Sequence, residues 1–334
     1  MDQALHDAYE YMLLFEEQLK VHATTLRQNG KTSPDFLEND LTYSVTPQSI
    51  NGIVCAVDAS LLTHATHSVD VILIRSVAAC FSYVDSKLIS CTYHPSRIPE
   101  TKIEIKTALD DHESMLWRSL IRLKSELSCA LSTVRAVTPA ILLIDGSLLP
   151  LVSDRPIATS VLIPLYQEVV TLYKELYLFC NDKKIYLVGV IKDSRGKRFI
   201  ESTAPQLNCN DTTFLNYFLK EKERTGVISL STDQSKNSVL RELTDHQLCL
   251  FYMKMSTRDR PLRIEFLNHQ TDFNKIASLL YSLCAIHESY AYPAVLIEAD
   301  LCALLDDKEL ERVKHSLHGL ESVLPLRRNS RPFR

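Results

Sequence analysis

Two short segments of the chain each end a run of buried-type apolar residues on an aspartate, and small residues follow that aspartate. The segments are Ile53–Ser60 and Ile141–Ser147. The pattern predicts two strands that deliver Asp58 and Asp145 to one edge of a sheet. Carboxylates are hard oxygen ligands, and in fixed positions they can hold a divalent metal against a phosphate. A nuclease is therefore the first class of function to consider.

The hydrophobic periodicity of the rest of the chain alternates between strand-like and helix-like segments. Strands are predicted at residues 53–57, 69–77, 87–93, 141–145, 185–191, 248–253 and 262–267. Helices are predicted at residues 4–27, 106–135, 161–179, 214–220 and 273–287. Strands separated by helices imply right-handed crossovers and a mixed sheet covered on both faces. We expect an α/β fold with a ribonuclease H-like core, in which the first strand lies beside the strand at 141–145.

The predicted elements suggest three regions along the chain. Residues 1–51 are expected to form an N-terminal helical arm and a connecting loop, because an amphipathic helix is followed by a stretch rich in Gly, Ser, Pro, Asn and Thr. Residues 52–305 are expected to form the main domain, with an insertion near 196–246. Residues 306–334 are expected to form a C-terminal helix and a basic tail. The arm either packs on its own domain, contacts a second copy in a dimer, or contacts a partner.

Composition excludes several classes of protein. The nine cysteines include no Cys-x-x-Cys pair, which argues against a zinc ribbon or a redox motif. We expect reduced thiols. The N-terminus carries Asp2, His6 and Asp7 and no unbroken apolar stretch, so it predicts neither a signal peptide nor a membrane span. A cytoplasmic protein without a membrane partner is expected.

The net charge of −4 does not indicate a general polyanion binder, so contacts with nucleic acid would have to come from local basic patches. The candidates are Lys192, Arg195, Lys197 and Arg198, then Lys254, Arg258, Arg260 and Arg263, and then Arg327, Arg328, Arg331 and Arg334. Such patches could hold a DNA backbone without reading bases. The alternative is solvated charge on loops and termini.

Further carboxylates could join the two aspartates. Glu126 lies at one border of the apolar stripe of the helix predicted at 106–135, and Glu113 lies at the other border, so either could supply a third ligand. Asp300 ends an apolar segment at 294–297 that repeats the pattern of the opening segments, and it is either a helix N-cap or another ligand. Asp145 also has a structural alternative, a turn with the following glycine.

An ordered set of motifs links these segments. The set consists of Ala56-Val-Asp58-Ala-Ser60, the helix holding Glu126, Leu143-Ile-Asp145-Gly-Ser-Leu148, Val188-Gly-Val-Ile-Lys192-Asp-Ser194, Arg260-Pro-Leu-Arg263-Ile-Glu-Phe266, Tyr292-Pro293 and Glu298-Ala-Asp300. In this order the motifs resemble the NurA nuclease family over roughly residues 53–305. No single motif is specific, but the ordered set is.

The resemblance implies a ribonuclease H-like nuclease that processes DNA ends in double-strand break repair. It implies Mn²⁺ or Mg²⁺ as cofactor, a homodimer, a HerA-type hexameric ATPase as partner, 5′ to 3′ exonuclease activity on single- and double-stranded ends, and a single-strand endonuclease activity. Asp58, Glu126 and Asp145 would be metal ligands, with Lys192 near the phosphate and Tyr292 beside the site. The family often has histidine where this chain has Asp300. A carboxylate at this position would make the site harder and more negative.

Two other classes compete with the nuclease. An actin-like phosphotransferase also has aspartates at strand ends, but it needs glycine-rich phosphate loops, and the chain has only seven glycines. A non-catalytic adaptor or clamp for DNA ends would use the same fold with structural carboxylates. The chain contains no Gly-x-x-x-x-Gly-Lys-Ser/Thr segment, so a nuclease of this sequence would need a partner to translocate DNA.

Overall fold

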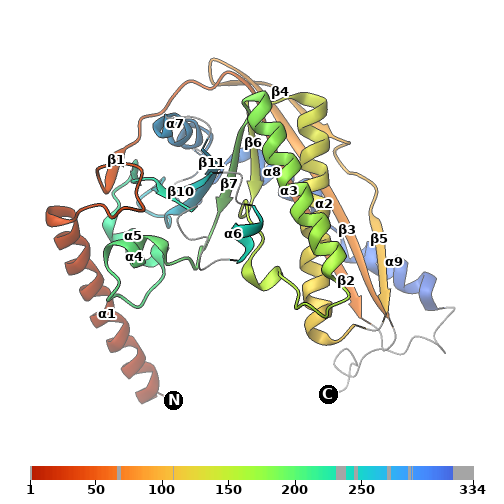
Figure 1. The fold of residues 1–334 in the computed structure, drawn as a ribbon, viewed down its shortest axis with the longest axis horizontal. Coiled ribbons are helices and arrows are strands. Elements are labelled where there is room, and N and C mark those ends of the chain that lie inside the picture. Colours follow the sequence, from red (N-terminus) through yellow and green to blue (C-terminus); the bar gives the residue numbers. More distant parts are fainter. Residues whose placement is uncertain are drawn as a thin grey trace. The chain divides into compact units, whose positions relative to one another are not determined.

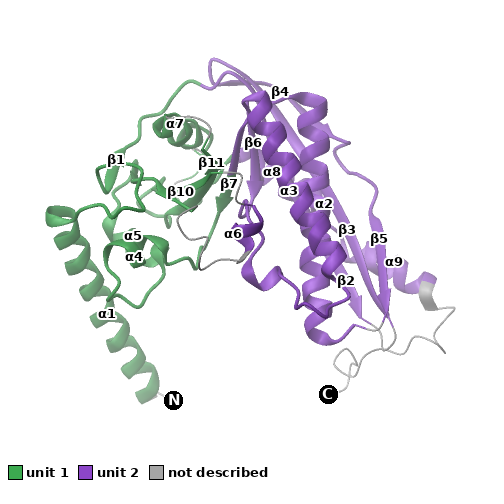
Figure 2. Cartoon of the chain, in the orientation of Figure 1, with its two compact units in different colours: residues 1–49, 189–234, 246–293 green, residues 50–188, 235–245, 294–334 purple. Residues whose placement is uncertain are grey.

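The computed structural model describes residues 2–65, 69–107, 109–230, 238–243, 247–268, 272–284, 287 and 289–318. The arginines predicted to form a basic tail, from Arg327 onward, lie outside these residues. The chain divides into two compact units, each built from separate stretches of sequence (Figure 2). Unit 1 contains Met1–Ser49, Gly189–Gln234 and His246–Pro293, and unit 2 contains Ile50–Val188, Ser235–Asp245 and Ala294–Arg334. The predicted linear regions, with boundaries after residues 51 and 305, stay a prediction.

Unit 2 contains an antiparallel meander of three strands. These are β2 (Gly52–Ala65), β3 (Val69–Val84) and β4 (Lys87–His94). The turn between β3 and β4 has positive φ at Asp85 and Ser86, the backbone twist that suits a two-residue hairpin. A further strand, β5 (Lys102–Thr107), pairs with the first part of β3, whereas β4 pairs with the last part.

The strand β6 (Ile141–Asp145) completes this part of the sheet. Within unit 2 the strand order is β6-β2-β3-β4, and β6 runs parallel to β2. The register pairs Val57 with Ile144, so the next position on each strand brings Asp58 beside Asp145. The prediction of a mixed sheet flanked by helices is confirmed, and the strand at 141–145 lies beside the first strand as predicted.

Helices cover both faces of these strands (Figure 1). One face carries α2 (Asp111–Val137) and α3 (Ile163–Lys183), and the other carries α8 (Ala294–Ala303) and α9 (Asp307–His318). Short elements of this unit are the 3₁₀ helix at Val152–Asp154 and α6 (Ser238–Glu242). The sheet core is therefore closed off from solvent on both sides, as the continuous apolar runs of β2 and β3 require.

The structure corrects two predicted elements of unit 2. The helix predicted from residue 106 begins at Asp111, because Asp110 caps it by accepting a 2.7 Å hydrogen bond from the Glu113 amide. The preceding Lys102–Thr107 forms β5, a strand with alternating apolar and charged residues that the sequence analysis missed. The apolar segment 294–297 was expected to resemble the opening strands but lies in α8. Short apolar runs do not separate a strand from a buried helix by periodicity.

Unit 1 has its own strands and helices. Its strands are β1 (Thr42–Ser44), β8 (Glu223–Thr225), β9 (Ile228–Ser229), β10 (Leu248–Lys254) and β11 (Leu262–Leu267). Its helices are α1 (Asp2–Asn29), α4 (Arg198–Thr203), α5 (Asp211–Phe218) and α7 (Phe273–Leu283). The strand order is β1-β8-β10-β11, with β9 also paired to β10. The strand β7 (Tyr186–Ile191) carries the chain from unit 2 into unit 1.

A buried arginine organises the core of unit 1. Arg224 is 1% exposed, and its guanidinium donates to Glu38 and Asn274 and lies 4.4 Å from the ring centroid of Tyr43. Residues 29–51, expected to be a connecting loop, therefore include β1 and contribute Glu38 and Tyr43 to this cluster. A charge buried in this way is stable only while its partners are present.

The N-terminal helix is divided between buried and exposed parts. Leu19 and Ala23 are buried, and α1 packs against α5 of its own unit. Leu5, Tyr9 and Met12 in the first half are exposed. Among the residues that the structure describes, none of the helices combines the length and apolar character needed to cross a bilayer.

The cysteines differ in part from the expectation. Cys55 on β2 and Cys80 on β3 face each other across the antiparallel pair and form a disulfide. The expectation of reduced thiols is wrong for this pair. The other described cysteines are free.

Candidate metal centre

Asp58 lies in the middle of β2, because the strand continues to Ala65, so the prediction that Asp58 ends its strand is wrong. The pairing of β2 with β6 does end there, at Val57. The residue is 7% exposed, and the Ala59 amide donates a 2.8 Å hydrogen bond to its Oδ1. The pKa of the Asp58 carboxyl is raised to about 6. Burial is the main cause, and the neighbouring carboxylates of Asp145 and Asp300 contribute to the same shift. Asp58 is thus the carboxylate that the other acidic groups surround.

Glu126 comes from α2 and is 2% exposed. Its Oε2 accepts a 3.0 Å hydrogen bond from Arg122, whereas its Oε1 is buried and has no hydrogen-bond partner. Burial raises the pKa of the Glu126 carboxyl to about 8, with further contributions from the charges of Asp58 and Asp145 and an opposing one from Arg122. An unpaired oxygen in such a position is unfavourable unless something binds it.

The alternative helical ligand, Glu113, lies elsewhere on α2. Its Oε1 accepts a 2.9 Å hydrogen bond from Ser160. With a rise of roughly 1.5 Å per residue, Glu113 lies about 20 Å along the helix from Glu126. The structure therefore brings Glu126, and not Glu113, to the two aspartates.

Asp145 ends β6, and Gly146 follows with a φ of 136°. An L-amino acid rarely adopts this backbone conformation, so the glycine is needed for the turn. The turn is compatible with a place in the acidic cluster, because Asp145 lies close enough to Asp58 to raise the pKa of Asp58. The role of Asp145 as a metal ligand stays a prediction.

Asp300 lies in the interior of α8 and not at its start. The expected N-cap role is therefore wrong, since the helix begins at Ala294, immediately after Pro293. Asp300 is exposed, and its carboxyl is near enough to that of Asp58 to raise the pKa of Asp58. A fourth acidic group thus reaches the same cluster from the opposite face of the sheet.

The donor set fits a hard divalent cation. Carboxylates from β2, α2, β6 and α8 converge within unit 2, and burial and mutual repulsion raise the pKa of two of them. Within the described part of the chain, no three carboxylate, imidazole or thiol groups already stand in the geometry of a metal site. The unpaired Oε1 of Glu126 is the atom that most clearly requires a partner.

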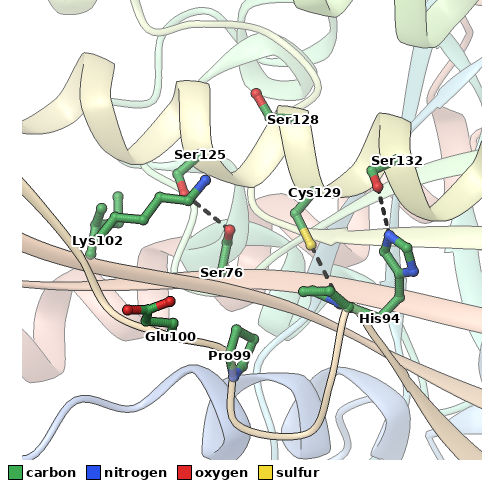
Figure 3. Close-up of a pocket in the computed structure, with 11 residues that line it drawn as sticks. Ser76, His94, Pro99, Glu100, Lys102, Ser125, Ser128, Cys129 and Ser132 are labelled. Atoms are coloured by element: carbon green, nitrogen blue, oxygen red, sulfur yellow. Dashed lines mark hydrogen bonds between the residues drawn. The ribbon is translucent and has the colours of Figure 1, made fainter.

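A separate cavity lies beside the same helix (Figure 3). It has a volume of about 290 Å³ and lies between α2 and the segment that joins β4 to β5. Ser125 donates a hydrogen bond to Ser76, and His94 contacts Ser132 at 2.6 Å, so the polar lining is largely paired internally. None of the four clustered carboxylates lines this cavity. The acidic cluster is therefore a distinct site.

Comparison with known proteins agrees with this arrangement. The model of the NurA domain matches residues 52–301. The chain belongs to the NurA domain family. The matched region includes all four clustered carboxylates, together with Lys192 and Tyr292.

Solved NurA structures share the fold. The NurA nuclease from Sulfolobus solfataricus matches with a TM-score of 0.60 at 17% identity, covering 96% of this chain and 99% of that one. A NurA structure with manganese matches with a TM-score of 0.54 at 11% identity, covering 98% and 99%. A NurA structure bound to dAMP and manganese matches with a TM-score of 0.54 at 12% identity, covering 96% and 97%. No curated protein matches the chain.

Two polar residues of the NurA motifs belong to unit 1. The Lys192 ammonium lies 4.0 Å from the ring centroid of Tyr292. Tyr292 is buried, and its hydroxyl donates a 3.3 Å hydrogen bond to the Val190 carbonyl. The two side chains thus form a cation–π pair within their own unit. Their participation in the metal centre stays a prediction.

The predicted DNA-binding residues of the NurA domain differ in exposure. Arg195, Lys197, Arg258 and Arg260 are exposed, and Arg198 is half-buried. Arg263 instead donates to the buried Glu265 through both Nε and Nη2, and a Cβ at Gly196 would lie 2.4 Å from its Nη1. This geometry favours a structural role for Arg263, because its guanidinium is already committed to a carboxylate.

Sequence reasoning missed one residue that contacts the acidic cluster, Arg122. It lies one helical turn before Glu126 and is paired with it. The four-residue spacing of opposite charges on α2 is a signal that could have identified the pair.

Proposed function

We propose that the protein is a metal-dependent deoxyribonuclease, a phosphodiester hydrolase acting on DNA. The observation that carries the proposal is that Asp58, Glu126 and Asp145, from three different elements of unit 2, lie near enough to one another to raise the pKa values of Asp58 and Glu126, while Oε1 of Glu126 is buried without a hydrogen-bond partner. Buried carboxylates with strongly raised pKa values are typical of functional sites. Family membership supports the same reading.

The chemistry of the proposed centre divides between cation and protein. A bound Mn²⁺ or Mg²⁺ would polarise the scissile phosphate and lower the pKa of a water molecule at the site. Asp58, Glu126 and Asp145 would hold the cation through hard oxygen donors, and Asp300 would add a fourth. Glu126 binds a proton tightly without the cation, because burial raises its pKa to about 8, so cation binding would release that proton.

The finer activity follows from the NurA resemblance. We infer a 5′ to 3′ exonuclease with single-strand endonuclease activity, which processes DNA ends in double-strand break repair in the cytoplasm. A homodimer would act with a HerA-type hexameric ATPase, and the absence of a P-loop motif from the sequence supports the need for such a partner. One solved NurA structure is bound to dAMP and manganese, which supports a deoxynucleotide and a divalent cation as ligands of the fold.

Lys192 would neutralise charge on the phosphate, and Tyr292 would act beside the reacting group. Contacts with the rest of the DNA backbone would come from other basic side chains. Exposed basic residues of the NurA domain would hold the backbone without reading bases; these are Arg195, Lys197, Arg258 and Arg260, with Arg198 at the edge of this set. Their contribution to binding should fall as the salt concentration rises.

Cleavage of end-labelled linear DNA tests the proposal. Wild type should cut with Mn²⁺ or Mg²⁺ and not with EDTA, and Asp58→Ala and Asp145→Ala should lose cutting while keeping DNA binding. Asp182→Ala, an exposed aspartate on α3, is the matched control and should cut like wild type. Each protein is assayed with and without a HerA-type ATPase. A wild type that binds DNA ends but never cuts them would replace the nuclease by the adaptor.

A further inference from the structure

The two carboxyl oxygens of Glu126 have different surroundings. Oε2 accepts a hydrogen bond from Nη1 of Arg122 at 3.0 Å, and Oε1 is buried without a partner. A carboxylate with both oxygens free could rotate about its terminal bond, since this torsion is broad. The bond from Arg122 restricts that rotation and decides which oxygen stays available.

Arg122 also faces the rest of the acidic cluster. The guanidinium interacts most strongly with Glu126 and more weakly with Asp58 and Asp145, and these carboxylates raise its pKa. Its side chain is 37% exposed, so it reaches from the solvent edge of α2 to a buried carboxylate. The Arg122 guanidinium therefore lies at the border between the acidic cluster and solvent.

A simple structural role is the competing interpretation. Exposed ion pairs on a helix surface stabilise a protein only weakly and have no consequence for a site. Arg135 on the same helix makes an exposed ion pair of this weak kind, at 3.2 Å from Glu175 of α3. The pair of Arg122 differs because its carboxylate is buried and lies against two further carboxylates.

We propose that Arg122 is a positioning residue, which holds Oε2 of Glu126 and thereby presents Oε1 to the divalent cation of the acidic cluster. This inference rests on the proposed function. Two effects of Arg122 on cation binding oppose each other, since its charge repels a cation while its hydrogen bond orders a ligand. Residues that orient metal ligands typically change metal affinity by about 10- to 100-fold. Positioning dominates here because guanidinium charge at the solvent edge is partly screened.

Mn²⁺ titration of the purified protein, followed by the EPR signal of free Mn²⁺, tests the inference without measuring cleavage. Arg122→Gln should weaken Mn²⁺ affinity about 10- to 100-fold. Arg122→Lys should recover part of the loss, because an ammonium can still donate to Oε2. Arg135→Ala is the matched control and should bind Mn²⁺ like wild type.

The outcomes separate this inference from the function on which it rests. A wild type that binds no Mn²⁺, or binding that Asp58→Ala leaves unchanged, overturns the metal centre and this inference with it. If wild type binds Mn²⁺ and Arg122→Gln binds it equally or more tightly, the positioning role alone is overturned. If circular dichroism shows that Arg122→Gln does not fold, Arg122→Lys decides: weaker binding than wild type supports the role, and unchanged binding overturns it.

Discussion

Replacing Glu126 by glutamine should stabilise the metal-free protein while it abolishes cutting. The glutamate has a pKa of about 8 in the folded protein and an ordinary value of 4.5. Because the folded pKa is the higher one, folding takes up a proton between these values, and stability falls as pH rises through that window. Glutamine has nearly the same shape and no such titration.

The magnitude follows from the size of this shift. Each pKa unit corresponds to about 1.4 kcal/mol, so at pH 7.5 the ionisable side chain reduces stability by at most about 4 kcal/mol. Asp58, whose pKa is raised to about 6, shares the same repulsion. We therefore expect Glu126→Gln to raise the free energy of unfolding by about 1–4 kcal/mol at pH 7.5, and by less than about 1 kcal/mol at pH 5.

Urea unfolding in EDTA at pH 5 and pH 7.5 measures this difference. Glu113→Gln is the control, since this residue lies on the same helix but is bonded to Ser160, and it should follow wild type at both pH values. Addition of Mn²⁺ should stabilise wild type more than Glu126→Gln. If wild type and Glu126→Gln lose the same stability between the two pH values, the raised pKa of Glu126 is refuted.

Three further substitutions test other parts of the structure. Asp300→His should lower the rate supported by Mg²⁺ relative to that supported by Mn²⁺, since Mg²⁺ prefers oxygen to imidazole ligands; cleavage rates in the two metals check this, and an unchanged ratio would exclude Asp300 as a ligand. Gly146→Ala should lower the free energy of unfolding by about 1–3 kcal/mol, because its φ of 136° strains an L-residue, and urea unfolding should detect the loss unless the turn rearranges. Arg224→Ala should destabilise the protein by about 3–5 kcal/mol because it removes the guanidinium that balances the charge of Glu38, and a thermal midpoint equal to that of wild type would contradict the buried pair.

The sequence predicted the strands that carry the two central aspartates, because their apolar runs are long, rich in β-branched residues and bounded by turn residues. The boundaries of β6 agree with the prediction, and the parallel neighbour of β2 was correctly identified. The helix carrying Glu126 was also predicted, but periodicity alone could not show whether Glu126 or Glu113 faces the two aspartates. That distinction required the register of α2 against the sheet, which depends on tertiary packing.

Other features could not be read from local patterns. β5 was missed because the apolar stripe of the following helix was extended backward over its alternating residues. The segment 294–297 was misassigned because α8 is apolar on nearly all sides, so it has no amphipathic signature. The structural role of Arg263 depends on Glu265, two residues away on the same strand face, and this pair is visible only when β11 is known to be a strand.

The order of these elements along the chain affects when the acidic cluster can form during synthesis. α8 packs on β2 and β3 through buried Val295, Leu296 and Ala299, yet more than a hundred residues separate it from β6. A nascent chain that has emerged only as far as Pro293 has no helix on that face and no Asp300. Domains fold as units once their sequence is complete, so the four-carboxylate cluster is assembled only after α8 has been synthesised. A shorter chain on the ribosome therefore carries an exposed sheet face and an incomplete acidic cluster.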